Sequence, residues 1–136
     1  DPLWSRGLGD VYKRQFMEFV GDSPLLALHA PFDQHMLGRA LKDSLGYRLQ
    51  HSFLDVADMA PLLCPQAQIR EAGLDDWVRW FNLQVVERHN AAADALATAE
   101  LALILFNRAR QQQIHSPLNL QQRLGQWKRR QQAPSF

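Results

Sequence analysis

The stretch Glu87-Arg88-His89-Asn90-Ala91-Ala92-Ala93-Asp94-Ala95 opens the longest helix that the sequence predicts. Asn90 is a good N-cap residue, because its side chain can accept hydrogen bonds from the unpaired N–H groups of the first turn. His89 would then lie on a loop just outside the helix, and Asp94 about one turn inside it. A titratable base on a loop beside a carboxylate on a helix suits metal-assisted hydrolysis. The structural alternative is that an acidic residue near a helix start is common, because it suits the helix dipole.

This helix is expected to run from about Ala91 to Gln113, with Leu96, Leu103 and Ile104 filling the core. Ser116-Pro117 breaks it, because the residue before a proline avoids the helical conformation. A last amphipathic helix is predicted over about Leu118 to Arg130.

The chain before this helix alternates between helical and strand patterns. The apolar run Pro24–His29 predicts a strand buried on both faces, and Tyr47–Leu54 alternates like a second strand. A helix is expected between them, up to Gly46. Another is expected from Asp55, which we interpret as its N-cap, and a short one over 74–81. The order of elements indicates an α/β fold.

Length and composition allow one compact domain of 136 residues, 46% of them hydrophobic. The single cysteine, Cys64, excludes an internal disulfide framework and suits a cytoplasmic location. No apolar run approaches the length of a membrane span, so no membrane partner is expected.

The net charge of +1 hides an asymmetry. Six of the fifteen basic residues and none of the fourteen acidic ones lie between Asn107 and Phe136. The acidic body could hold divalent cations and the basic end could contact phosphate. The alternative for this end, which we treat as a separate segment over residues 114–136, is a solvated helix face or a frayed terminus.

Residues 1–15 resemble a translated sequencing adapter and are expected to be a leader without an evolved role. The native part would then be a partial domain over residues 16–113. Only two strands are visible in it, and the first has the pattern of a central strand. We therefore expect that the first strands of the sheet precede Phe16 and are absent from this chain.

A second group of polar residues, His29-Ala30-Pro31-Phe32-Asp33, follows the first predicted strand. Ligand sites in open α/β sheets lie at the carboxyl ends of strands. With His89, Ala91 and Asp94, this segment resembles the second and third motifs, H-N-x-x-F-D and H-x-A-x-x-D, of the DEDDh family of 3′–5′ exonucleases. This is the DnaQ-like group that includes the proofreading epsilon subunit of DNA polymerase III. The second motif departs from the pattern, with Ala30 in place of Asn and one residue fewer before Phe32.

The resemblance implies a ribonuclease-H-like fold and removal of nucleotides from the 3′ end of single-stranded DNA by a two-metal mechanism. It implies Asp33 and Asp94 as ligands of two Mg²⁺ or Mn²⁺ ions, and His89 as the general base. His29 is expected to order the turn and Phe32 to pack, with contact to the substrate as the alternative for both. A DNA polymerase is the protein partner that the resemblance suggests.

The first family motif, D-x-E on the first strand, does not occur upstream of His29. Because that motif supplies two of the four acidic ligands, we expect this chain to be inactive although its parent is an exonuclease. We also expect it to fold poorly, because the strand over 24–29 would have an uncovered edge.

Two alternatives stay open. One is a 3′–5′ exoribonuclease of the same family, which would trim RNA. The other is a non-catalytic module that binds nucleic acid or a polymerase through its basic C-terminal segment. Trp77, Trp80 and Trp127 could stack on bases, but their helical spacing among Leu and Phe is more typical of a core.

Overall fold

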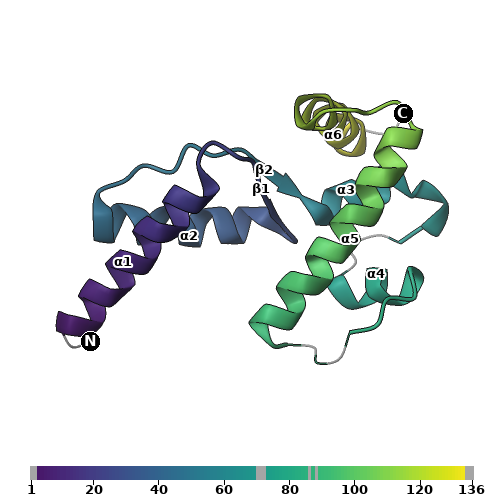
Figure 1. The fold of residues 1–136 in the computed structure, drawn as a ribbon. Coiled ribbons are helices and arrows are strands. Elements are labelled where there is room, and N and C mark those ends of the chain that lie inside the picture. The colour runs from purple at the N-terminus through teal and green to yellow at the C-terminus, as the bar shows by residue number, and fades with distance from the viewer. Residues whose placement is uncertain (1–2, 70–72, 86, 88, 134–136) are drawn as a thin grey trace.

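The computed structural model describes residues 3–69, 73–85, 87 and 89–133. Two short strands and a set of helices follow one another along the chain (Figure 1). The strands are β1 (Leu25–Ala27) and β2 (Phe53–Asp55), a 3-10 turn covers Pro65–Ala67, and the helices are α1 (Leu3–Val20), α2 (Ala30–Leu45), α3 (Val56–Leu63), α4 (Leu74–Trp80), α5 (Ala91–Gln111) and α6 (Pro117–Gln132). Within these residues no helix is both long and apolar enough to cross a membrane.

The two strands pair in parallel, with Leu25 opposite Phe53 and Ala27 opposite Asp55. Helix α2 forms the crossover between them. In the described part of the chain β1 pairs only with β2, and Leu26 is 40% exposed. The prediction of a strand buried on both faces is therefore wrong for this chain, because all three residues of β1 stay partly exposed and Leu26 borders a pocket that Phe106 and Leu120 also line.

The second strand is shorter than the pattern over 47–54 predicts. Residues 47–52 form no regular structure, and pairing begins where Leu25 N–H donates to the Ser52 carbonyl at 2.8 Å. The next donor that would face this strand is the Ser23 N–H, and it donates to the Val20 carbonyl at 3.1 Å instead, so the ladder stops there. An alternating pattern without a pairing partner does not make a strand.

The helix starts agree with the sequence predictions. The Asp55 carboxylate accepts a hydrogen bond from Ala57 N–H at 3.0 Å and caps α3. The Asn90 side chain accepts from Ala92 and Ala93 N–H, at 3.0 and 3.2 Å, and caps α5. These bonds satisfy backbone donors that the helix itself leaves unpaired.

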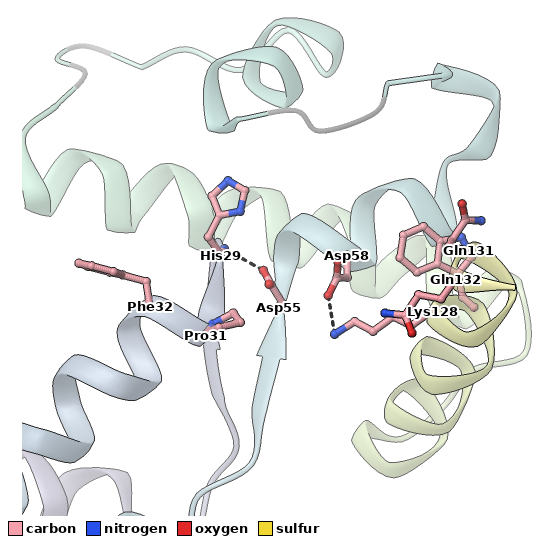
Figure 2. Close-up of a pocket in the computed structure, with 9 residues that line it drawn as sticks. His29, Pro31, Phe32, Asp55, Asp58, Lys128, Gln131 and Gln132 are labelled. Atoms are coloured by element: carbon pink, nitrogen blue, oxygen red, sulfur yellow. Dashed lines mark hydrogen bonds and ion pairs between the residues drawn. The ribbon is translucent and has the colours of Figure 1, made fainter. Parts of the chain in front are cut away.

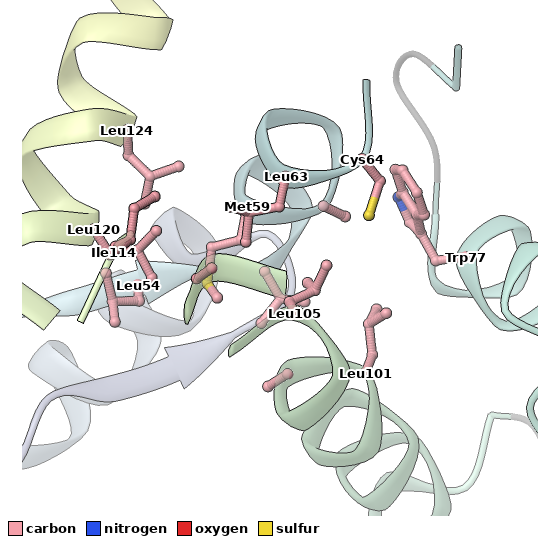
Figure 3. Close-up of a cluster of buried hydrophobic side chains, with 14 of the residues drawn as sticks. Leu54, Met59, Leu63, Cys64, Trp77, Leu101, Leu105, Ile114, Leu120 and Leu124 are labelled. Atoms are coloured by element: carbon pink, nitrogen blue, oxygen red, sulfur yellow. The ribbon is translucent and has the colours of Figure 1, made fainter. Parts of the chain in front are cut away.

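The hydrophobic core lies between α3, α5 and α6, with Trp77 of α4 at one end (Figure 3). Helix α5 turns a face of small and large apolar residues toward it: Ala97, Leu101, Ala102, Leu105 and Ala109. The prediction that Leu96 and Leu103 fill the core is wrong, because these two side chains are 61% and 68% exposed. They lie on the opposite side of the helix from Leu101.

Helices α1 and α2 lie on one side of the strand pair, and α3 to α6 lie on the other (Figure 1). Helix α1 runs without a break across residues 15 and 16, where the sequence suggested that a leader ends. The division into leader, partial domain and tail stays a prediction, as does the ribonuclease-H-like fold.

Candidate active site

Asp33 and Asp94, which lie far apart in the sequence, line one pocket of about 580 Å³. Asp33 is in the first turn of α2, directly after β1, and Asp94 is in the first turn of α5. Leu28 and Thr98 also line this pocket, which we call the carboxylate pocket. The Thr98 hydroxyl donates to the Asp94 carbonyl at 2.8 Å. The fold thus brings both predicted metal ligands to one cavity beside the carboxyl end of β1.

His29 lies at the edge of this pocket, in a left-handed backbone conformation with a φ of 63° at the N-cap of α2. Its N–H donates to the Asp55 carboxylate at 2.8 Å, which joins the end of β1 to the end of β2. The predicted role in ordering the turn therefore belongs to the backbone of His29, since its side chain does not cap the helix.

His89 also has a left-handed backbone, with a φ of 72°, and it directly precedes the N-cap of α5. Its N–H donates to the Asp94 carboxylate at 3.2 Å, and the residue is exposed. The predicted base is thus tied through its main chain to a predicted metal ligand. Its exposed position leaves the imidazole open to exchange protons with solvent.

Phe32 is 70% exposed, so the expectation that it packs is wrong. It lies instead at one end of a second cavity of about 550 Å³, which we call the α6 groove (Figure 2). Gln131 and Gln132 of α6 lie at the other end, and Asp55 and Asp58 lie between (Figure 2). His29 lines both cavities, so the groove and the carboxylate pocket meet at this residue.

Lys128 of α6 pairs with Asp58 of α3 across the groove, with Nζ and Oδ2 2.9 Å apart (Figure 2). Trp127 lines the groove as well and is half-buried. Its burial therefore does not decide between the two roles that the sequence left open, packing in the core and stacking on bases. No motif in the sequence singles out Lys128 or places Trp127 in a site. The charge asymmetry of the sequence marks the C-terminal segment as basic, but it does not show that this segment packs beside Asp58 of α3.

The described residues do not fit a complete two-metal site. They contain no group of three or more His, Cys, Asp or Glu side chains placed to hold a metal ion. Asp33 and Asp94 are two carboxylates, and Mg²⁺ demands a nearly octahedral set of oxygen ligands. The expected Mg²⁺ or Mn²⁺ pair therefore needs ligands beyond the residues described.

Comparison with curated proteins finds relatives that are DNA polymerases III of the PolC type. The protein of Clostridium perfringens is 30% identical over 110 residues, which is 80% of this chain and 7% of the relative. That of Listeria innocua is 30% identical over 113 residues, or 81% and 8%. That of Bacillus subtilis is 28% identical over 114 residues, or 83% and 8%.

The chain thus spans less than a tenth of the length of these relatives. No protein-family model matches it, and no solved structure matches it.

Proposed function

We propose that this chain is part of a DnaQ-like 3′–5′ exonuclease of the DEDDh type, with a ribonuclease-H-like fold, that acts in DNA replication. The observation that carries the proposal is that Asp33 and Asp94 line the same pocket. These are the carboxylates of the two motifs that the sequence retains, and they reach the pocket from separate helices at the end of a parallel strand, where α/β folds place ligand sites.

The relatives support DNA over RNA as the substrate, because they carry the name DNA polymerase III. The family that the motifs resemble includes the proofreading subunit of a DNA polymerase III. The motif resemblance and the similarity of about 110 aligned residues to these relatives both support a role in DNA replication. In this proposal a DNA polymerase is the partner and a single-stranded 3′ end is the substrate.

In this proposal Asp33 and Asp94 are two of the carboxylates that hold Mg²⁺ or Mn²⁺, and His89 takes the proton from the attacking water. The hydrogen bond from His89 N–H to Asp94 keeps the base beside the ligand. Its position on an exposed turn suits a group that must release the proton to solvent after each cycle. The described residues supply two carboxylates of a larger ligand set, and we expect this chain to be inactive alone.

A gel assay with 5′-labelled single-stranded DNA and Mn²⁺ tests the proposal. This chain is compared with a longer one in which a strand carrying D-x-E precedes Phe16. The longer chain should shorten the DNA from its 3′ end, and this chain should not. A His89→Asn variant of the longer chain should lose activity at least a hundredfold, since asparagine tolerates the left-handed backbone but cannot act as a base.

Two results would contradict the proposal and favour one of the alternatives. If the longer chain degrades single-stranded RNA and spares DNA, the exoribonuclease alternative is correct. If it folds and binds DNA but never cuts it, the chain belongs to a non-catalytic binding module. Far-ultraviolet circular dichroism of each variant ensures that a loss of cleavage is not a loss of fold.

A further inference from the structure

The α6 groove holds a combination of groups that suits single-stranded nucleic acid. Phe32 offers an exposed aromatic ring at one end, and Lys128 and Gln131 of α6 offer a cation and an amide at the other (Figure 2). Proteins that bind single strands combine aromatic rings, on which bases stack, with basic side chains along the backbone. The volume of about 550 Å³ lies within the range of ligand sites.

The carboxylates in the groove already have partners. Asp55 Oδ1 accepts hydrogen bonds from the N–H groups of His29 and Ala57, and Asp58 pairs with Lys128. The Lys128–Asp58 pair is partly exposed, and the Lys128 ammonium has three N–H donors, so Lys128 can donate to a phosphate while it stays paired with Asp58. Helix α6 itself is basic, since it contains Arg123, Lys128, Arg129 and Arg130 and no acidic residue.

The groove leads away from the carboxylate pocket. His29 lines both cavities, and Phe32 and Asp33 are adjacent in the first turn of α2, one lining each cavity. A strand whose 3′ end lies at Asp33 and Asp94 would therefore pass Phe32 first and reach α6 next.

We propose that the α6 groove binds the single strand upstream of the 3′-terminal nucleotide, with a base stacked on Phe32 and a phosphate held by Lys128. The direction of the strand rests on the proposed function; the binding itself does not. Helix α6 is in this view part of the nucleic-acid site, and the motifs that the sequence shares with exonucleases do not include it.

Fluorescence anisotropy with a labelled single-stranded oligodeoxynucleotide in EDTA tests the proposal on this chain. Phe32→Ala should weaken binding about fivefold or more, because an alanine removes one stacking partner. Phe19→Ala, at an even more exposed phenylalanine of α1, is the matched control and should bind like the wild type. Neither ring is in the core, so both variants should keep the fold.

The salt dependence of binding tests Lys128 separately. Lys128→Gln should lower the slope of log Kd against log salt by about 0.7, the value for one phosphate contact to a single strand. Lys42→Gln, which removes the same charge from the exposed end of α2, should leave the slope unchanged. Heparin serves as a polyanion without bases, and its binding should not respond to Phe32→Ala.

If the oligonucleotide does not bind, or binds while Phe32→Ala and Lys128→Gln match their controls, the groove is not a nucleic-acid site and the proposal fails. It fails also if heparin binding shows the same dependence on Phe32. None of these results bears on cleavage by the longer chain, so the groove and the proposed function can fail independently.

Discussion

Asp55 is the residue at which the two strands and a helix are joined. One carboxylate oxygen accepts from Ala57 N–H at the start of α3 and from His29 N–H at the end of β1. Asp55→Ala removes both bonds and is expected to lower the free energy of unfolding by about 2 kcal/mol, the upper value for loss of an N-cap. Urea unfolding followed by tryptophan fluorescence measures this. Asp43→Ala, on the exposed surface of α2, is the control, and an equal effect of the two would contradict the joining role.

Cys64 gives the stability a pH dependence. Burial raises the pKa of its thiol, and the nearby Arg108 guanidinium opposes this in part. A raised pKa in the folded state means that folding favours the neutral thiol. The folded state has its full stability below the pKa of the unfolded thiol, about 8.5. As the pH rises above that value the unfolded thiol ionises first, and the free energy of unfolding falls until the folded thiol ionises too.

We therefore expect the free energy of unfolding of the wild type to fall above about pH 8.5, by at most about 1.4 kcal/mol per pH unit from this group. Cys64→Ala should lack this part of the decline, because it has no group to ionise. Urea titrations of both proteins between neutral and alkaline pH measure the difference. Parallel curves would show that the thiol has the same pKa in both states.

At the scale of the element, α5 has two apolar faces with opposite environments. Leu101 is fully buried in the core, whereas Leu103 is 68% exposed. Leu101→Ala should cost about 2–5 kcal/mol of stability, because it removes buried apolar volume and leaves a cavity. Leu103→Ala should change stability by no more than about 0.5 kcal/mol. The same chemical change two residues apart, measured by urea unfolding, thus tests the orientation of the helix, and equal costs would mean that it is wrong.

The elements also show what a sequence can predict. The caps at Asp55 and Asn90 depend on backbone groups two or three residues away, and these predictions are confirmed. The exposure of Leu103 and the length of β2 depend on which other segments pack against α5 and pair with β2. The residue pattern within one segment does not contain that information. The candidate site shows the same difference between local features, which the sequence predicts, and contacts between distant segments, which it does not. The motifs indicated Asp33 and Asp94, but the place of Lys128 beside Asp58 arises only when α6 packs near α3.

At the scale of the whole molecule, stability is expected to differ between the two sides of the strand pair. The core cluster consists of residues from Leu54 to Leu124. Val20 and Leu41 of α1 and α2 are buried outside this cluster. Regions that bury less apolar surface open at lower free energy.

Amides of α1 and α2 should therefore exchange with deuterium faster than those of α3 and α5, by an order of magnitude or more. Hydrogen exchange measured by mass spectrometry on peptides from each helix gives these rates. The amides of α6 serve as the internal comparison, since α6 belongs to the core cluster. Uniform protection across all helices would indicate a single cooperative unit.

The position of the core between Leu54 and Leu124 also matters for how the chain is made. Synthesis proceeds from the N-terminus, so α1, β1 and α2 leave the ribosome before any of the residues that form the core. Phe32 and Met36 stay exposed even in the finished molecule, and Leu25 has no pairing partner until Phe53 emerges. Among the described residues β1 thus has no strand to pair with during the translation of more than twenty residues. Over that interval a chaperone that binds extended apolar segments has a target in the growing chain.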